Sequence, residues 1–391
     1  MDNATIIEGT VSYQQIAAKC IEYVPGWTDL RPDDISISPM LEGLSNLLYK
    51  VERPAITTCG QQHVDDAEEN PSFLDESSPS NSVFAAPLVV LFRVYGLSVT
   101  SFYDSDLELT VFRTMSSFNY GPRMYAHGAG WRIEEYYQFH RVVQVHELRD
   151  SRIYLQVARK LGALHQVWRS SEFPITMKQR KPICFTRLDN WTSEALKALQ
   201  QVTSQASPVG SPIYEIPEGI LHGIDSMKHT LTRGFESGTL GFHVVFGHGD
   251  IQENNLMVLR GEDCSDLRLI DFEYADMNLQ GADIGNFFGE FTMDYIVSEG
   301  PMFTGDNTKY PPVELQEDFC SAYLEVYFGR PAHKEEIGEL MQALHTFRQL
   351  SNLLWGMWAI IRSKQNADTK FGLFEYAKFR FDTFLNEVRS D

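Results

Sequence analysis

The spacing of apolar residues predicts an N-terminal portion rich in strands and a longer portion that is mainly helical. Residues 12–24 show helical spacing, 35–51 predicts a strand, a turn and a strand, and 87–96 predicts one buried strand. A further hairpin opens at Gly121, and its last strand spans 131–137. The pattern at 170–210 is mixed. Helical spacing recurs in the segments 104–117, 150–168, 215–236, 287–295, 313–328, 334–364 and 371–388.

One segment between the predicted strands, residues 52–86, has a different composition. It is acidic, rich in Ser and Pro, and poor in apolar residues. Such a segment cannot bury enough apolar surface to order itself, so we expect a disordered insertion. A tolerated surface loop is the simplest interpretation of this insertion, and a regulatory role is the alternative.

Composition and charge narrow the classes of function. The 391 residues suffice for two lobes, and a net charge of −20 without a compensating basic stripe argues against nucleic-acid binding. The five cysteines form no C-x-x-C pair, so the sequence predicts neither a zinc site nor a disulfide framework. No apolar window reaches the length of a membrane span, and the N-terminus shows no basic region followed by an apolar one. We therefore expect a cytoplasmic protein without membrane insertion.

The most informative chemical pattern lies in residues 244–274. Two short apolar runs each lead into a carboxylate, the first into the loop of Asp250 and the second into Asp271. Asn255 follows Asp250 by five residues. Between the two carboxylates, residues 259–266 have the length and composition of a hairpin connection.

Phosphoryl transfer explains this pattern. The reaction needs a group that orients the attacking hydroxyl and oxygen ligands that hold Mg²⁺ on the nucleotide phosphates. Protein kinases supply them as an Asp, an Asn five residues later and an Asp after the next hairpin. Asp250, Asn255 and Asp271 have this order and spacing, which predicts a phosphotransferase with a kinase fold. If His248 and Asp250 were ordinary turn residues and Asp271 a strand cap, their shared spacing would have no explanation.

Two features of the strand-rich portion fit nucleotide binding. The amides of a small polar turn at 42–46 could cover phosphates, although taken alone an ordinary turn explains this segment better. Arg93 is the lone charge in a buried strand, and Glu108 in the next predicted helix is its natural partner. This pair would stand where kinases place the Lys–Glu pair that anchors phosphates. The alternative is an exposed arginine at a strand end.

Three linked segments resemble the choline/ethanolamine kinase family. They read GHGDIQENN, LIDFEYADMNLQGADIGNFFGEFTMDY, and LLWGMWAIIRSK followed by FGLFEYAKFRFD. Weaker similarity in EGLSNLLYKV, LFRVYG and YGPRMY extends the match over most of residues 35–388. The C-terminal segments are highly specific to the family, and the N-terminal ones are not.

The resemblance implies an α+β fold of the protein-kinase type, with a small lobe built on an antiparallel sheet and a large, mainly helical C-terminal lobe. We expect a nucleotide-binding lobe at 1–137 and a lobe for catalysis and choline binding at 138–391. The implied reaction is Mg²⁺-dependent transfer of phosphate from ATP to the choline hydroxyl. This is the first step of the CDP-choline route to phosphatidylcholine. The family also implies a homodimer.

The resemblance assigns roles position by position. Asp250 would be the base that orients the choline hydroxyl. Asn255 and Asp271 would bind Mg²⁺, with Gln252 and Glu273 nearby in the metal and phosphate site. The residues implied at the nucleotide are Ser45, Asn46, Arg93, Glu108, Glu135 and Tyr137. Asp283 would support the active-site loops.

The implied acceptor pocket agrees with the chemistry of choline. A quaternary ammonium has no N–H to donate, so it is recognised by aromatic faces and negative charge. Trp355 and Trp358, at positions i and i+3, share one face of a predicted helix. Taken alone, a Trp pair at this spacing is more often part of a core. The resemblance places the pair in a cationic pocket with Tyr274, Glu290, Tyr295 and Tyr376.

Four positions depart from the family pattern. Gly249 stands where Asn is usual, and Asn254 stands where Gly is usual. Leu373 replaces a pocket tyrosine, and Phe291 a tryptophan, of animal choline kinases. The QE-x-N and DFEY spellings favour choline, whereas the loss of an aromatic wall favours ethanolamine. We expect choline as the preferred substrate and ethanolamine as a second one.

Three alternatives stay open. An ethanolamine kinase, or a kinase for another small amino alcohol, would have a less aromatic pocket. An aminoglycoside-phosphotransferase-like enzyme shares the H-x-D loop, but the two tryptophans and the DFEY-to-DIGN segment argue against it. A catalytically silent scaffold would not bind nucleotide with magnesium, and the intact Asp250, Asn255 and Asp271 argue against that role.

Overall fold

The computed structural model describes residues 11–40, 46–54, 86–95, 105–204, 216–261, 264, 266–295, 302–365 and 371–389. Most of the segment 52–86, which we expect to be disordered, lies outside the described residues, as does most of the turn at 42–46. The chain forms two compact units, one of residues 1–101 with 122–138 and one of residues 102–121 with 139–391.

The first unit contains a five-stranded antiparallel sheet in the order β1-β2-β3-β5-β4. Its strands are β1 (Ser36–Met40), β2 (Asn46–Glu52), β3 (Val89–Tyr95), β4 (Met124–Gly128) and β5 (Trp131–Glu135). Buried and half-buried residues alternate along β3, as expected for a strand with one face in a core. The pairs β1–β2 and β4–β5 are the two hairpins predicted from the sequence.

Helix α1 (Tyr13–Tyr23) completes the core of this unit. A capping box begins the helix, because the Ser12 and Gln15 side chains each accept a hydrogen bond from the other residue's backbone N–H. The helix contributes Ile16 and Cys20 to a cluster with sheet residues that include Phe92, whose ring stacks on that of Trp131.

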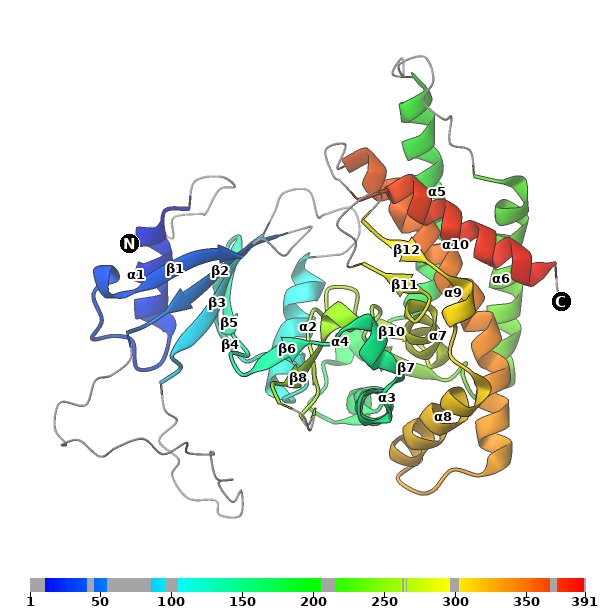
Figure 1. Cartoon of the computed structure of the whole chain (residues 1–391), viewed down its shortest axis with the longest axis horizontal. Coiled ribbons are helices and arrows are strands. Elements are labelled where there is room, and N and C mark those ends of the chain that lie inside the picture. Colours follow the sequence, from blue (N-terminus) through cyan, green and yellow to red (C-terminus); the bar gives the residue numbers. More distant parts are fainter. Residues whose placement is uncertain are drawn as a thin grey trace. The chain divides into compact units, whose positions relative to one another are not determined.

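The second unit combines short antiparallel sheets with helices (Figure 1). Its strands pair as β6-β8-β9, β10-β7 and β11-β12. Their bounds are β6 His140–Val142, β7 Val244–Gly247, β8 Leu256–Leu259, β9 Arg268–Leu269, β10 Asp276–Leu279, β11 Met293–Asp294 and β12 Thr304–Gly305. The helices are α2 Ser105–Ser117, α3 Ser151–Leu164, α4 Ile175–Lys178, α5 Ile183–Ser204, α6 Glu218–Ser237, α7 Gly281–Glu290, α8 Val313–Phe328, α9 Lys334–Gln365 and α10 Leu373–Val388. In the described part of the chain, no helix is both long and apolar enough to cross a membrane.

The hairpin predicted between the two carboxylates is confirmed, because β8 pairs antiparallel with β9. The helix predicted at 287–295 is wrong in its bounds. Helix α7 begins at Gly281 and ends at Glu290, and β11 follows at residues 293–294. Nearly all of α7 is buried, so no polar face marks its ends in the sequence. Helix α5 occupies much of the stretch whose pattern is mixed.

The contacts of α2 group it with the second unit, whereas the lobes predicted at 1–137 and 138–391 put this segment in the first. The lobe boundaries therefore stay a prediction.

Helix α7 is buried in the second unit, and glycine lets it approach α9 closely. A Cβ on Gly285 would lie 2.7 Å from both the carbonyl carbon and the Cβ of Phe347, and one on Gly281 would lie 2.1 Å from the Phe347 ring. Helix α9 also packs against α5, α8 and α10 (Figure 1). The start and the middle of α7 thus pack closely on Phe347 of α9, at Gly281 against its ring and at Gly285 largely against its backbone.

This packing makes Gly285 sensitive to a single added methyl group. We expect Gly285→Ala to lower the free energy of unfolding by about 1–3 kcal/mol, because the contacted Phe347 atoms belong largely to the backbone. Gly338→Ala in α9 is the matched control: nothing lies within 4 Å of its added Cβ, so the better helix propensity of Ala should stabilise the protein by up to about 1 kcal/mol. Urea unfolding of both variants measures the difference, and equal effects would contradict the packing argument.

Candidate active site

The loop after β7 carries Asp250, and Asn255 fixes its side chain. The Asn255 Nδ2 donates to the backbone carbonyl of Asp250 at 2.9 Å and to its Oδ2 at 3.0 Å. A single turn of 3-10 helix at Glu253–Asn255 brings the amide back towards Asp250, and the Gln252 side chain caps this turn by accepting from the Asn254 N–H. The spacing of five residues thus lets one amide contact both ends of the Asp250 residue.

Asp283, near the start of α7, holds the same loop from behind. Its Oδ2 accepts from the His248 backbone N–H at 2.7 Å and from His165 Nε2 at 3.0 Å, and its Oδ1 accepts from the Gly249 N–H at 2.8 Å. His165 Nδ1 lies 2.7 Å from the Tyr323 hydroxyl. His165 is therefore a packed histidine, with both ring nitrogens engaged.

The buried His248 ring ties the loop of Asp250 to that of Asp271. Its Nε2 donates to the carbonyl of Ile270 at 2.9 Å, and its Nδ1 accepts from the backbone N–H of Asp250 at 3.3 Å. One nitrogen donates and the other accepts, which defines a neutral imidazole. Burial lowers the pKa of His248, which agrees with this protonation state. The ring also packs on Phe272, with the centroids 4.6 Å apart.

Two residues of these loops have backbone angles in the left-handed region. Asp271 has φ of 64°, a conformation that Asp adopts more readily than most residues, and Gly249 has φ of 84°. A Cβ on Gly249 would lie 2.3 Å from the carbonyl oxygen of Tyr274. The replacement of the usual Asn by glycine therefore allows the two loops to touch through their backbones.

Two buried carboxyl groups of this unit, those of Asp250 and Glu253, have raised pKa values. Burial raises the pKa of Asp250 to about 8, and the charges of Glu290 and Asp271 add to the effect, while Asn255 and Arg380 oppose it. Burial and the charge of Glu290 likewise raise the pKa of Glu253 to about 8, and its Oε2 has no hydrogen-bond partner among the described residues. A positive charge bound beside these two groups would lower their pKa values.

The residues expected to hold Mg²⁺ suit a hard cation. Asn255 and Asp271 offer an amide and a carboxylate oxygen, and Glu273 follows two residues later. The described residues contain no group of three or more His, Cys, Asp or Glu side chains arranged to hold a metal. That arrangement is not needed for Mg²⁺, which typically binds one or two carboxylates together with substrate phosphates.

An aromatic cluster lies in the same unit. The ring centroids of Tyr274 and Trp355 are 5.5 Å apart, as are those of Trp355 and Trp358. Tyr376 lies 6.4 Å from Trp358 and 6.4 Å from Tyr295. The structure thus brings together the five aromatic residues assigned to the cationic pocket, from two helices and two loops.

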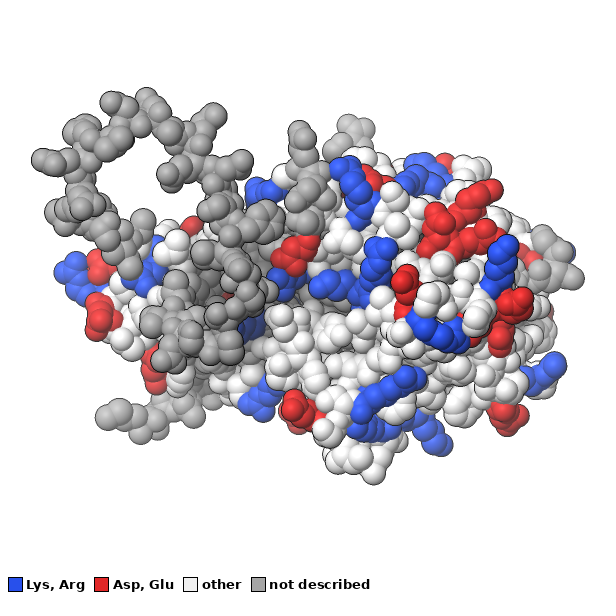
Figure 2. Space-filling model, turned by 90° about the horizontal axis from the view of Figure 1, so that it is seen from below, with Lys and Arg blue, Asp and Glu red and all other residues white. Residues whose placement is uncertain are grey.

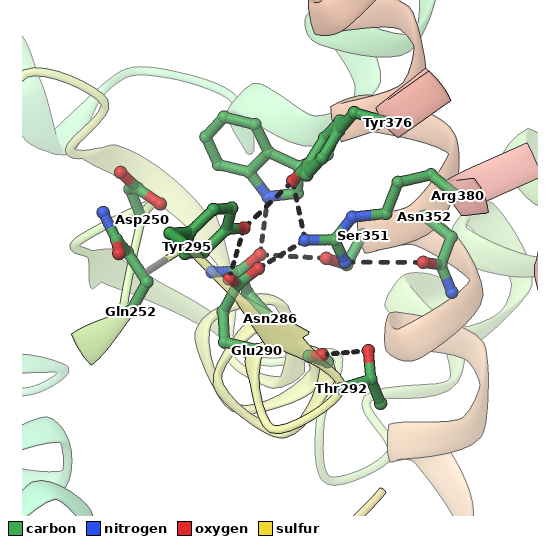
Figure 3. A network of polar contacts seen from close by, with 12 residues as sticks. Asp250, Gln252, Asn286, Glu290, Thr292, Tyr295, Ser351, Asn352, Tyr376 and Arg380 are labelled. Carbon is green, nitrogen blue, oxygen red and sulfur yellow. Dashed lines mark hydrogen bonds and ion pairs between the residues drawn. The ribbon is translucent and has the colours of Figure 1, made fainter. Parts of the chain in front are cut away.

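Polar contacts link this cluster to Glu290 (Figure 3) and to the loop of Asp250. Trp355 Nε1 donates to Asn286 Oδ1 at 2.6 Å, and Asn286 Nδ2 donates to the carbonyl of Ile251, the neighbour of Asp250, at 3.2 Å. Glu290 accepts from the Tyr295 hydroxyl at 2.8 Å. Trp358 Nε1 donates to the Tyr274 hydroxyl at 2.9 Å.

Sequence reasoning missed several members of this site. Asn286 lies in α7 and Arg380 in α10, and neither residue was assigned to the site. Trp191 lies in α5, where no helix was predicted, and its ring centroid is 6.3 Å from that of Tyr274. Arg187, one turn earlier, donates to the Tyr274 carbonyl at 2.6 Å. No local signal marks Arg187, because the same helix also carries Asp189, Glu194 and Lys197.

Two of the departures from the family pattern lie in different environments. Leu373 belongs to the buried cluster that contains Tyr376. Phe291 packs instead with Phe287 and Phe288 in the other core cluster of this unit. Only Leu373 is therefore placed to alter the aromatic cluster directly.

The residues expected at the nucleotide are spread over both units. Ser45 lies outside the described residues, and Asn46 begins β2. Arg93 Nη2 contacts Glu134 at 3.2 Å, a partner that the sequence did not indicate, and Arg132 contacts the same carboxylate at 2.6 Å.

Glu135, at the end of β5, accepts from the Arg123 N–H at 3.0 Å, and Tyr137 follows it. Glu108 lies in α2 of the second unit, so its pairing with Arg93 stays a prediction.

The Asp283 contacts generate a pH-dependent prediction. Burial would raise the pKa of Asp283, but the hydrogen bond and charge of His165, with His248 and the Gly249 N–H, hold it below its ordinary value. A group with a lowered folded-state pKa stabilises the fold above its unfolded pKa of about 3.9, and this contribution is lost as the pH falls through the folded-state value. We expect Asp283→Asn to lower the free energy of unfolding by about 1–3 kcal/mol at neutral pH, because an amide N–H₂ would face a buried N–H.

The loss should shrink as the pH falls below about 4, where the wild type also loses the ionised carboxylate. Chemical unfolding from pH 3 to pH 7 measures it. Asp382→Asn, at a half-exposed position on α10, should change stability by no more than about 0.5 kcal/mol. If Asp283→Asn lowered the free energy of unfolding by the same amount at every pH, the result would contradict a role for the charge of the Asp283 carboxylate.

Comparison with known proteins identifies the family. A family model described as choline/ethanolamine kinase matches residues 37–385. The chain is 30% identical over 379 residues to a rat choline/ethanolamine kinase (94% of this chain, 84% of the relative) and 26% identical over 401 residues to mouse choline kinase alpha (95% and 79%). The crystal structure of a choline kinase from Cryptosporidium parvum aligns with a TM-score of 0.77 at 27% identity, covering 97% of this chain and 96% of that one. The protein-kinase-like α+β fold predicted from the sequence is confirmed, and the chain belongs to the choline/ethanolamine kinase family.

Proposed function

We propose that this protein transfers the γ-phosphoryl group of ATP to the hydroxyl of choline. The observation that carries the proposal is the polar link between the loop of Asp250 and the aromatic cluster. Asn286 bonds to the carbonyl of Ile251 on one side and to Trp355 on the other. One small substrate can therefore present a hydroxyl to Asp250 while its cationic end meets aromatic rings.

The chemistry at the hydroxyl end follows from the contacts of Asp250. Its side chain is held by Asn255, and its backbone is held by His248, so the carboxylate is already positioned before substrate binds. We propose that Asp250 orients the hydroxyl and takes its proton as the phosphoryl group is transferred. Asn255 and Asp271, with Glu273 and Gln252 nearby, would hold Mg²⁺, which would neutralise charge on the phosphates.

The chemistry at the cationic end follows from how the polar tips of the aromatic residues are used. The indole N–H of Trp355 donates to Asn286, and that of Trp358 donates to the Tyr274 hydroxyl. What the cluster offers a ligand is therefore mainly ring faces, which attract a quaternary ammonium by about 2 kcal/mol or more per desolvated contact.

The remaining assignments are proposals that rest on the family. ATP would bind through the first unit, at Ser45, Asn46, Arg93, Glu135 and Tyr137. On the face shown in Figure 2, the described Lys and Arg side chains are interspersed with Asp and Glu and form no continuous basic stripe, which agrees with small-molecule substrates. A cytoplasmic homodimer that supplies phosphocholine for phosphatidylcholine synthesis is the corresponding biological role.

Ethanolamine is the second candidate substrate. Leu373 lies in the buried cluster with Tyr376, at a position where animal choline kinases carry a tyrosine, so the pocket has one aromatic wall fewer. A primary ammonium relies less on ring faces because it donates hydrogen bonds.

The proposal is tested by ADP release from ATP and Mg²⁺ in separate titrations with choline and with ethanolamine. We expect choline to support turnover at the lower concentration. Asp250→Asn should reduce kcat by about 10²–10⁴-fold, the range of general-base catalysis. Asp266→Asn in the neighbouring hairpin, where the carboxylate binds Arg268, is the matched control and should keep wild-type turnover. Absence of turnover with both substrates would overturn the proposal.

A further inference from the structure

Four buried or half-buried side chains beside the aromatic cluster form a closed ring of hydrogen bonds (Figure 3). Arg380 Nη2 donates to Glu290 Oε1 at 2.5 Å and to the Tyr376 hydroxyl at 2.7 Å. The Tyr295 hydroxyl donates to Glu290 Oε2 at 2.8 Å and lies 3.4 Å from the Tyr376 hydroxyl. Because the Tyr295 proton points at Glu290, Tyr376 is the donor in the last contact. We name these four residues the Glu290 ring.

The ring joins elements that are distant in the sequence. Glu290 ends α7, Tyr295 follows β11, and Tyr376 and Arg380 lie one turn apart on α10. Glu290 is 3% exposed and Arg380 is 1% exposed. A buried charge pair in this position is costly to desolvate, and an apolar pair of similar volume is often as stable. The ring therefore calls for an explanation other than stability.

The presence of Arg380 is unexpected in a pocket for a cation. Burial opposes its charge, but Tyr376 and Glu290 outweigh burial and keep its pKa well above the ordinary value. The guanidinium thus cancels the charge of Glu290, and both protons of Nη2 are used within the ring. A cation that relied on an ion pair with Glu290 would have to compete with Arg380.

We propose that Arg380 and Tyr295 are positioning residues that set substrate choice: by occupying both oxygens of Glu290 they make the pocket favour a quaternary ammonium over a primary one. This inference rests on the proposed function. A primary ammonium leaves water with three N–H donors, and each needs an acceptor once it is buried. Every oxygen of the ring already takes part in a hydrogen bond, so a buried N–H would have to share an acceptor whose charge Arg380 already offsets. A quaternary ammonium has no N–H, loses no hydrogen bond on entering, and meets the ring faces.

Binding of two small ions tests this inference without requiring turnover. Tetramethylammonium and methylammonium carry the same charge, and they differ in whether they can donate hydrogen bonds. We would measure their dissociation constants by ligand-observed NMR titration of the full chain. The wild type should bind tetramethylammonium more tightly.

Tyr295→Phe keeps the aromatic face but releases Glu290 Oε2. We expect the preference for tetramethylammonium, as the ratio of the two dissociation constants, to fall by about tenfold, the effect of one hydrogen bond to a charged group. Tyr376→Phe is the matched control, because it removes a hydroxyl from the same ring but leaves both contacts to Glu290 in place. Its ratio should change by no more than about twofold.

Arg380→Met should lower the ratio further, and Arg380→Lys, which keeps a charge beside Glu290, should restore part of it. If Arg380→Met does not fold, Tyr295→Phe and Arg380→Lys decide the outcome. If Arg380 and Tyr295 had a purely structural role, each variant would weaken the binding of both ions by the same factor. That result would overturn the inference.

Choline turnover by the wild type distinguishes a failure of this inference from a failure of the proposed function. Turnover, together with an unchanged ratio of the two dissociation constants in the variants, would overturn the inference alone. Absence of turnover, together with no binding of either ion, would remove the proposed function and the inference with it.

Discussion

The carboxylate of Asp283 is the interaction on which the candidate site depends. It binds two consecutive backbone N–H groups, those of His248 and Gly249, and the ring of His165. The loop it holds is short and irregular, so few internal hydrogen bonds would otherwise fix it. Asp283 lies near the start of a buried helix, so its own position is fixed by core packing. Its hydrogen bonds therefore fix the position of the loop of Asp250. The site is rigid because the helix behind it is.

Helix α7 connects the two halves of the proposed chemistry. Asp283 near its start holds the catalytic loop, Asn286 in its middle binds Trp355, and Glu290 at its end joins the Glu290 ring. These residues are buried because α7 packs against α9 and contributes apolar side chains to a core cluster. The residue that supports the loop of Asp250 and the residues beside the aromatic cluster therefore share one helix, which fixes the distance between them.

The sequence predicted those parts of the site that depend on local spacing. Asp250, Asn255 and Asp271 were recognisable because a loop and a hairpin hold them at fixed separations. Trp355 and Trp358 share a helix face, but only the resemblance to the family assigned them to the pocket. The sequence could not indicate contacts between segments far apart, such as Arg380 with Glu290 or Arg93 with Glu134. Helix α7 was misplaced because its residues are buried on all sides, so the periodicity that reveals an amphipathic helix is absent.

Gly249 has a consequence for how this site can vary. Its Cα lies against the backbone carbonyl of Tyr274, with no space for a side chain, and Arg187 holds the same carbonyl from α5. Position 249 neighbours Asp250, and Tyr274 contributes a ring to the aromatic cluster. A larger residue at position 249 would have to displace the backbone of Tyr274. A change at position 249 would therefore alter the loop of Asp250 and the aromatic cluster together.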